Sequence, residues 1–203
     1  MLLDVLLARP GLPGKTRILV AVAVAIWHGD WQRLRDLAAR SEAAGVVRTD
    51  LEEVLLQAVL FCGFPRVVTA FETLQEAWPT ATSPSGGSLP ADQQVAAGRE
   101  LFRGIYGRNA TAVDAMLRSF HADFHAFVLE AAYGRILARP ALSAMVRETI
   151  AVGLLAAQDQ VRQFAGHARG AMHFGASKDE LREAVVTALG DIAAVDGWCA
   201  RIR

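Results

Sequence analysis

Apolar side chains recur at helical spacing along most of this sequence. Between residues 51 and 63, one stripe of a helix would carry Leu51, Val54, Leu55, Ala58 and Val59. The run 18–27 is apolar on nearly every side, which predicts a helix buried in a core. Such a pattern is typical of an all-α protein.

Capping and breaking residues place the ends of the helices. Asp30 can cap a helix that ends at Gly45, Gly63 stops the next helix, and Pro65 suits the first turn of its successor. Residue 139 precedes a proline and is pushed out of the helical region. The expected helices are 15–27, 31–44, 51–62, 66–78, 92–106, 111–120, 122–137, one opened by Glu148, one that carries 160–167, and a last segment from 178.

Residues 79–92 are rich in proline, serine and glycine, which is typical of a flexible connector. This connector divides the chain into an N-terminal part, 1–78, and a C-terminal part, 93–203. We expect the two parts to pack together as one compact unit.

An offset of 130 residues relates the two parts. Three landmarks share it without a gap: Arg17 with Arg147, Gly45 with Gly175, and Leu51 with Leu181. Capping-box spacings at Thr49/Glu52 and Ser177/Glu180 fall at the same junction, shifted by two residues. The sequence therefore predicts two copies of a three-helix unit.

The second copy keeps polar side chains that the first copy partly lacks. The offset pairs Ile18 with Glu148, Asp30 with Gln160, Arg33 with Gln163, and Leu37 with His167. Gln160, Gln163 and His167 are spaced by three and four residues and share one helix face. His167 is a candidate for proton transfer because imidazole titrates near neutral pH, and Glu148 could orient it. The alternative is structural: a buried histidine on a backbone carbonyl, a glutamate at a helix start, and solvated glutamines.

Other polar residues have two interpretations each. Arg139 could bind a substrate carboxylate in bidentate fashion or form an ordinary salt bridge. Cys62 could line a pocket or serve as a small hydrophobe. His121 and His125 have the spacing of metal ligands on a helix, but no third ligand follows at useful spacing, so we expect no metal site.

Composition narrows the classes of partner. The chain has 203 residues, 53% of them hydrophobic and 7% aromatic, with 21 basic and 21 acidic side chains. This balance gives no net field to attract nucleic acid or an anionic membrane. The run 18–27 is about half the length that crosses a bilayer, and the N-terminus lacks the basic region of a secretory signal. We expect a cytoplasmic protein. Cys62 and Cys199 form neither a CxxC motif nor a disulfide framework.

Several segments resemble the carboxymuconolactone decarboxylase family. Residues 51–71, LEEVLLQAVLFCGFPRVVTAF, are similar to its C-terminal helices, and 98–107, GRELFRGIYG, resemble its N-terminal helix. Residues 132–142 and 167–185, AYGRILARPAL and HARGAMHFGASKDELREAV, resemble its central part. The segments stand in a permuted or fused order. The resemblance implies the all-α fold shared with alkyl hydroperoxidase D, here as two related three-helix repeats, and assembly as homo-oligomers, with a trimer favoured.

The resemblance also implies site residues. The hydroperoxidase branch uses a glutamate, a CxxC pair and a histidine; Glu148 and His167 occupy matching positions, but Gln160 and Gln163 replace the cysteines. Without a thiolate pair there is no disulfide to cycle. The decarboxylase branch also lacks CxxC and keeps a histidine at the position of His167. Glu130 lies where the family usually has a polar or acidic group near the pocket.

These residues lead to three hypotheses. The first is a decarboxylase-like enzyme, free of cofactor and metal, that acts on a small carboxylated or lactone-like molecule with His167 as general acid or base and Glu148 as its partner. The second is a non-catalytic binding or assembly member of the family. The third, a thiol peroxidase, would need Cys62 and Cys199 within disulfide range.

Overall fold

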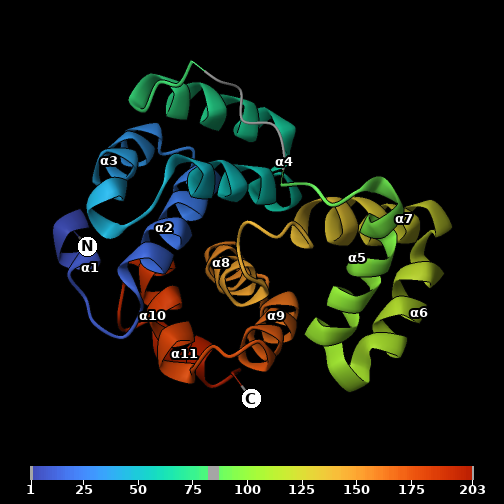
Figure 1. Ribbon diagram of the computed structural model, residues 1–203. Helices are drawn as coiled ribbons and strands as arrows, with labels where there is room; N and C mark the ends of the chain where they lie inside the picture. The colour runs from blue at the N-terminus through green and yellow to red at the C-terminus, as the bar shows by residue number, and fades with distance from the viewer. Residues whose placement is uncertain (1, 82–86, 203) are drawn as a thin grey trace.

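The computed structural model describes residues 2–81 and 87–202, and every regular element in these ranges is a helix (Figure 1). The all-α prediction is confirmed. The elements are α1 (Leu3–Leu7), α2 (Gly14–His28), α3 (Trp31–Ser41), η1 (Glu42–Ala44), α4 (Arg48–Ala77), α5 (Ala91–Tyr106), η2 (Gly107–Asn109), α6 (Ala110–Phe120), α7 (Ala122–Phe127), η3 (Val128–Leu137), α8 (Ala144–Ala157), α9 (Val161–His173), α10 (Lys178–Leu189) and α11 (Val195–Cys199).

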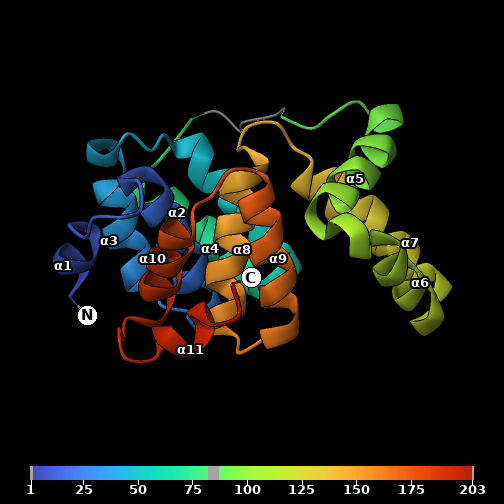
Figure 2. The ribbon, with the colours of Figure 1, turned by 90° about the horizontal axis from the view of Figure 1, so that it is seen from below.

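Two apolar helices, α2 and α8, pack against each other at the centre, and the remaining helices of the main body surround them (Figures 1 and 2). Leu19 and Val20 on α2 and Ile150 and Leu154 on α8 have no exposed surface. Gly153 lets the two helices approach closely, because a Cβ there would lie 2.6 Å from a Val20 methyl carbon. Their nearly uniform apolar surface follows from contact with neighbours on most sides.

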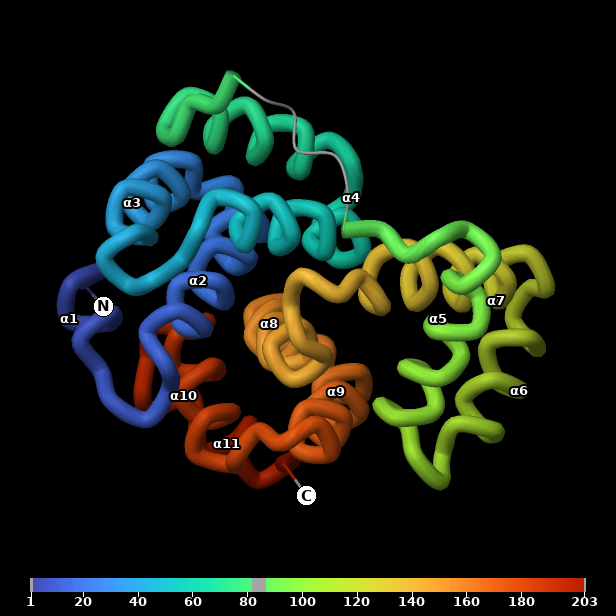
Figure 3. Tube along the Cα trace, viewed as in Figure 1, coloured from blue at the N-terminus to red at the C-terminus, as the bar shows by residue number. Residues whose placement is uncertain are grey.

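Helix α4 is broken at Gly63, whose φ of 75° and ψ of 167° are not helical. The chain changes direction there, and Pro65 lies in the first turn of the second half (Figure 3). By length and composition α4 is apolar enough to cross a membrane. The break divides it into two short rods, and the stripe of Leu51, Val54 and Leu55 on the first rod is buried in the core.

The C-terminal part begins with an arm that stands beside the main body (Figure 2). In this arm α5 packs along η3 with two glycines in contact, since a Cβ on Gly98 would lie 2.6 Å from the amide nitrogen of Gly134. The sequence predicted one α-helix over 122–137, whereas the chain turns from α-helix into a ten-residue π-helix at Val128. Wider π turns of this kind are common near functional sites.

Most helix ends confirm the predicted caps. The Asp30 side chain accepts the Arg33 amide hydrogen, Gly45 ends its segment with φ of 71°, and Ser177 and Glu180 form a capping box. The predicted box at Thr49/Glu52 is wrong, because α4 already begins at Arg48. There the Asp50 carboxylate accepts the Val47 amide hydrogen at 3.0 Å. Residues 47 and 50 lie 130 positions before Ser177 and Glu180. The two capping positions therefore obey the same offset as the other landmarks, without the predicted shift of two residues.

A buried ion cluster joins the two parts. Glu53 on α4 accepts hydrogen bonds from Arg139, at 2.6 Å, and from Arg147 on α8, at 2.7 Å. Arg147 also donates to Gln57, and only 1% of its side chain is exposed. Both arginines belong to the C-terminal part and the glutamate to the N-terminal part.

In a second cluster the two parts exchange roles: the glutamate belongs to the C-terminal part and the two arginines to the N-terminal part. Glu183 on α10 binds Arg9 at 2.5 Å and Arg17 on α2 at 3.1 Å, and Arg17 donates to Thr187. Each of these residues lies 130 positions from its equivalent in the first cluster. Such a reciprocal exchange is what an internal repeat with two equivalent faces predicts.

Candidate functional site

A histidine and a glutamate meet in the interior of the C-terminal part. His167 on α9 and Glu148 on α8 are joined by a hydrogen bond of 2.8 Å between Nδ1 and Oε2. The Glu148 side chain is 1% exposed and that of His167 10%. From Ile150 to Ala156, every buried residue of α8 is apolar. The Glu148 carboxylate therefore borders a low-dielectric part of the core.

The pair favours a charged imidazole. Burial lowers the pKa of His167, but the charge of Glu148 and its hydrogen bond outweigh burial, so the pKa lies above its ordinary value. A carboxylate on Nδ1 also fixes the tautomer and leaves Nε2 as the nitrogen that can exchange a proton. The pair can therefore keep the imidazole protonated at a higher pH than a free histidine can.

Small residues on α9 make room for this pair. A Cβ on Gly170 would lie 2.8 Å from Oε2 of Glu148, and a Cβ on Gly166 would lie 3.3 Å from the ring of Tyr106. Any larger residue at Gly170 would displace the carboxylate or Ile105 behind it. The spacing of glycine and histidine on α9 is thus part of the site.

Aromatic rings cover the histidine from the arm and from α4. The rings of Tyr106 on α5 and Phe61 on α4 lie edge-on to His167, with centroids 6.4 and 6.5 Å away. The Tyr133 hydroxyl donates to the Tyr106 hydroxyl at 3.1 Å, and Phe102 packs against both tyrosine rings. Burial raises the pKa of both tyrosines, so both stay protonated donors.

The sequence patterns do not indicate these two tyrosines as site residues. Both lie in segments that carry the family resemblance, 98–107 and 132–142, and that was the available signal. Glu130, which the resemblance favoured, is exposed on η3. Its contribution to a pocket stays a prediction.

The structure separates the predicted set around His167. Phe61 contacts the histidine, and its carbonyl oxygen accepts a hydrogen bond from Gln158 at 3.0 Å. Gln160 and Gln163 are exposed, and the Gln160 side chain donates to the Gln158 carbonyl. They lie at the start of α9, on its solvent side, and their role in substrate binding stays a prediction.

The first copy has apolar side chains where the second has the pair. Ile18 and Leu37, the counterparts of Glu148 and His167, are 1% and 0% exposed. The counterparts of the two glutamines, Asp30 and Arg33, line a cleft of about 240 Å³ between α2, α3 and α10. Copy one thus has a surface cleft at these positions but no buried ionisable pair.

Arg139, predicted to bind a substrate carboxylate, already has a carboxylate partner. Its guanidinium is bidentate to Glu53 and donates to Ser88 at 2.6 Å. The predicted geometry is present, but the carboxylate belongs to the same chain. We therefore assign Arg139 to the cluster that joins the two parts.

The two cysteines are free thiols. Burial raises the pKa of Cys62 to about 11, and burial also raises the pKa of Cys199. Near neutral pH both are protonated, whereas a reactive cysteine needs its thiolate. Their environment does not favour thiol peroxidase chemistry.

The histidines of the His121–His125 spacing have structural partners. The His121 ring accepts the amide hydrogen of Asp123, and His125 bonds to Asp114 at 2.7 Å. Within residues 2–81 and 87–202, no group of three His, Cys, Asp or Glu side chains is placed to hold a metal ion.

A cleft of about 450 Å³ opens near the pair, between α5, the end of η3, the start of α8 and the end of α9. Leu101, Leu142 and Phe174 give it apolar walls, and Glu100, Arg139 and His173 also line it. Ala144, one helical turn before Glu148, is a further lining residue.

Known proteins include relatives of this chain. "Peroxisomal protein 2" of Schizosaccharomyces pombe is 27% identical over 138 residues, which cover 66% of this chain and 64% of that protein. The 4-carboxymuconolactone decarboxylase of Acinetobacter baylyi is 30% identical over 70 residues, 34% of this chain and 52% of that protein. The chain thus spans somewhat more than half the length of the curated relatives it matches.

The family comparison covers more of the chain. The sequence model of the carboxymuconolactone decarboxylase family matches residues 2–76 and residues 122–200, which include both helices of the Glu148–His167 pair. With most of its residues matched and an all-α fold, the chain belongs to the carboxymuconolactone decarboxylase family.

Proposed function

We propose that the protein is a decarboxylase-like lyase in which the Glu148–His167 pair transfers a proton to a small carboxylated or lactone-like substrate. The observation that carries this proposal is the bond of 2.8 Å between the two side chains inside an apolar helical core. A buried ionisable pair with a shifted pKa is costly to keep and is characteristic of functional sites.

The proposed step uses the imidazolium form of His167. As the carbon–carboxylate bond of the substrate breaks, CO₂ leaves and the bonding electrons pass into the conjugated system of the substrate. The Nε2 proton of His167 is then transferred to the carbanionic carbon, and solvent returns a proton to the ring. Glu148 keeps the ring oriented and stabilises its charge before the transfer.

The tyrosine pair supports this chemistry. Tyr133 donates its hydroxyl hydrogen to Tyr106, so the hydrogen of Tyr106 is free to bond an oxygen that gains charge on the substrate. The Tyr106 ring lies edge-on to His167 with centroids 6.4 Å apart, so we expect one substrate to contact both groups. We expect Tyr106→Phe to lower kcat about tenfold to a thousandfold, and Tyr133→Phe to lower it less.

We place the approach of the substrate in the cleft of about 450 Å³ between α5 and the start of α8. Its apolar walls suit a small ring, and Ala144 in its lining lies one helical turn before Glu148. Ala97 on α5 lines this cleft, so Ala97→Trp would fill it and raise KM while leaving the pair intact.

The test is CO₂ release from a panel of small carboxylated lactones and β-keto acids that includes 4-carboxymuconolactone. We expect one member to be turned over, with His167→Gln at least a hundredfold slower. His28→Gln, which replaces an exposed histidine of the first copy, is the matched control. Equal turnover by the His167→Gln and His28→Gln variants would refute the proposal.

A non-catalytic binding member is the second candidate. It is favoured by the apolar replacements Ile18 and Leu37, since one copy has lost the pair while keeping the fold. Binding without turnover would appear as a rise in Tm with members of the same panel and no CO₂ release.

Two expectations about cell biology remain proposals. We propose a cytoplasmic location and assembly with copies of the same chain, with the trimer favoured. Light scattering coupled to size-exclusion chromatography measures the number of copies, and a mass of one chain would refute the second expectation.

A further inference from the structure

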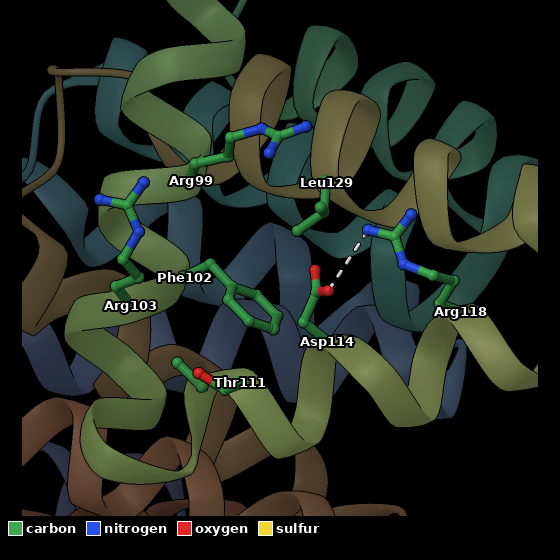
Figure 4. Close-up of a pocket in the computed structure, with 8 residues that line it drawn as sticks. Arg99, Phe102, Arg103, Thr111, Asp114, Arg118 and Leu129 are labelled. Atoms are coloured by element: carbon green, nitrogen blue, oxygen red, sulfur yellow. Dashed lines mark hydrogen bonds and ion pairs between the residues drawn. The ribbon is translucent and has the colours of Figure 1, made fainter.

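A third cleft, of about 240 Å³, lies between α5 and α6 on the arm (Figure 4). Phe102 extends from α5 toward Asp114, Arg99 extends from α5 above Leu129, and the Asp114–Arg118 pair forms the opposite wall on α6. The side chains of the Glu148–His167 pair do not line this cleft. It also shares no lining residue with the cleft of about 450 Å³.

The cleft carries an excess of positive charge. Arg99, Arg103 and Arg118 line it together with a single carboxylate, Asp114. That carboxylate is shared, because it bonds to His125 at 2.7 Å and to Arg118 at 3.4 Å. In the part of the chain that the structure describes, neither Arg99 nor Arg103 has a hydrogen-bond or ion-pair partner.

These two arginines are neighbours on one face of α5. They are four residues apart on α5, so they stand one above the other on one helix face, where like charges repel. Both guanidiniums offer donors in a planar fork that matches an oxyanion. A bound anion would offset the repulsion and replace water on the exposed donors of both side chains.

The floor of the cleft is apolar and firm. Phe102 and Leu129 are each 4% exposed, and Phe102 is held by the rings of Tyr106 and Tyr133 with centroids 4.7 and 5.0 Å away. The Thr111 hydroxyl stands on the rim as a further donor. A charged rim over an apolar floor is the arrangement that binds a small organic anion.

We propose that the cleft between α5 and α6 binds a small oxyanion, a carboxylate or a phosphate, through Arg99 and Arg103. Calorimetric titration at low ionic strength with two probes, inorganic phosphate and benzoate, tests it and identifies the source. Binding of phosphate alone indicates a phosphate ligand, and tighter binding of benzoate indicates an organic carboxylate that uses the floor at Phe102.

Substitutions test whether the anion binds at Arg99 and Arg103. We expect the double variant Arg99→Ala/Arg103→Ala to bind the preferred probe at least tenfold more weakly, while Arg135→Ala, which removes an exposed arginine of η3 outside the cleft, binds like the wild type. Both replaced arginines are exposed and alanine favours helices, so the fold is retained, as circular dichroism will show.

A third variant separates this cleft from the Glu148–His167 pair. His167→Gln should leave binding unchanged; a benzoate held by the pair would instead be weakened by His167→Gln and not by the double arginine variant. Absence of binding of both probes to the wild type, or equal binding by the double variant and Arg135→Ala, would overturn the proposal.

Discussion

Replacing Glu53 by glutamine removes the single negative charge that pairs with two buried arginines at the junction of the two parts. Arg147 is 1% exposed and Arg139 9%, and the Glu53 carboxylate that both bind is absent in Glu53→Gln. Breaking a buried ion pair from one side costs about 3–5 kcal/mol, because the remaining charge is left uncompensated. We expect a loss of this size in the free energy of unfolding.

Urea unfolding followed by circular dichroism measures the loss. Glu76→Gln is the matched control, since the Glu76–Arg35 pair is exposed on the surface and should contribute at most about 1 kcal/mol. The equivalent change in the second cluster, Glu183→Gln, should cost less than Glu53→Gln, because its partner Arg9 is 23% exposed. Equal losses for Glu53→Gln and Glu76→Gln would refute the role of the cluster in joining the parts.

Glu53 also makes the free energy of unfolding depend on pH in the acid range. Burial alone would raise the pKa of Glu53, but the bonds from Arg139 and Arg147 outweigh it and bring the pKa below its ordinary 4.5. Its contribution is therefore present above pH 4.5 and lost as the pH falls through the lowered pKa.

Three further predictions concern the site and its frame. Because the pKa of His167 is raised above 6.5, its contribution to stability is present below pH 6.5 and lost as the pH rises through the folded pKa; urea unfolding should show this decline in the wild type and not in His167→Gln. Gly98→Ala should destabilise the arm by about 1–3 kcal/mol, because the new Cβ would overlap the backbone of Gly134, and an unchanged midpoint of unfolding would contradict that contact. Cys62, with a pKa of about 11, should react with iodoacetamide at neutral pH about a hundredfold more slowly in the folded than in the unfolded chain, as mass spectrometry can follow; equal rates would contradict its burial.

The helices could be predicted because their ends depend on local patterns. Gly45, Gly63 and Asp30 act through their own backbone or side chain within a turn, so their effects are readable from neighbouring residues. Thr49/Glu52 misled for the same reason: the spacing fits a capping box, but the helix begins at Arg48 and Asp50 takes the role of Glu52.

The site was predictable only in part. The Glu148–His167 contact joins two adjacent helices whose polar residues stand out against an apolar background. Tyr106 and Tyr133 come from the arm, and their contact depends on the close approach of α5 and η3 at Gly98 and on a π-helix that no spacing rule indicates.

Arg139 shows a different limit. The sequence predicted a bidentate arginine, and the structure contains one, yet its partner Glu53 lies 86 residues away in the chain. Sequence spacing identifies the chemistry of a side chain but not which distant group the fold brings to it.

The measurement that tests the central claim most directly is a nuclear magnetic resonance titration of the His167 ring, in the wild type and in Glu148→Gln. If Glu148 sets the charge of a buried proton carrier, the wild-type pKa lies above 6.5, and it falls below 6.5 in the variant, where only burial remains. A pKa that is the same in both proteins would contradict the account.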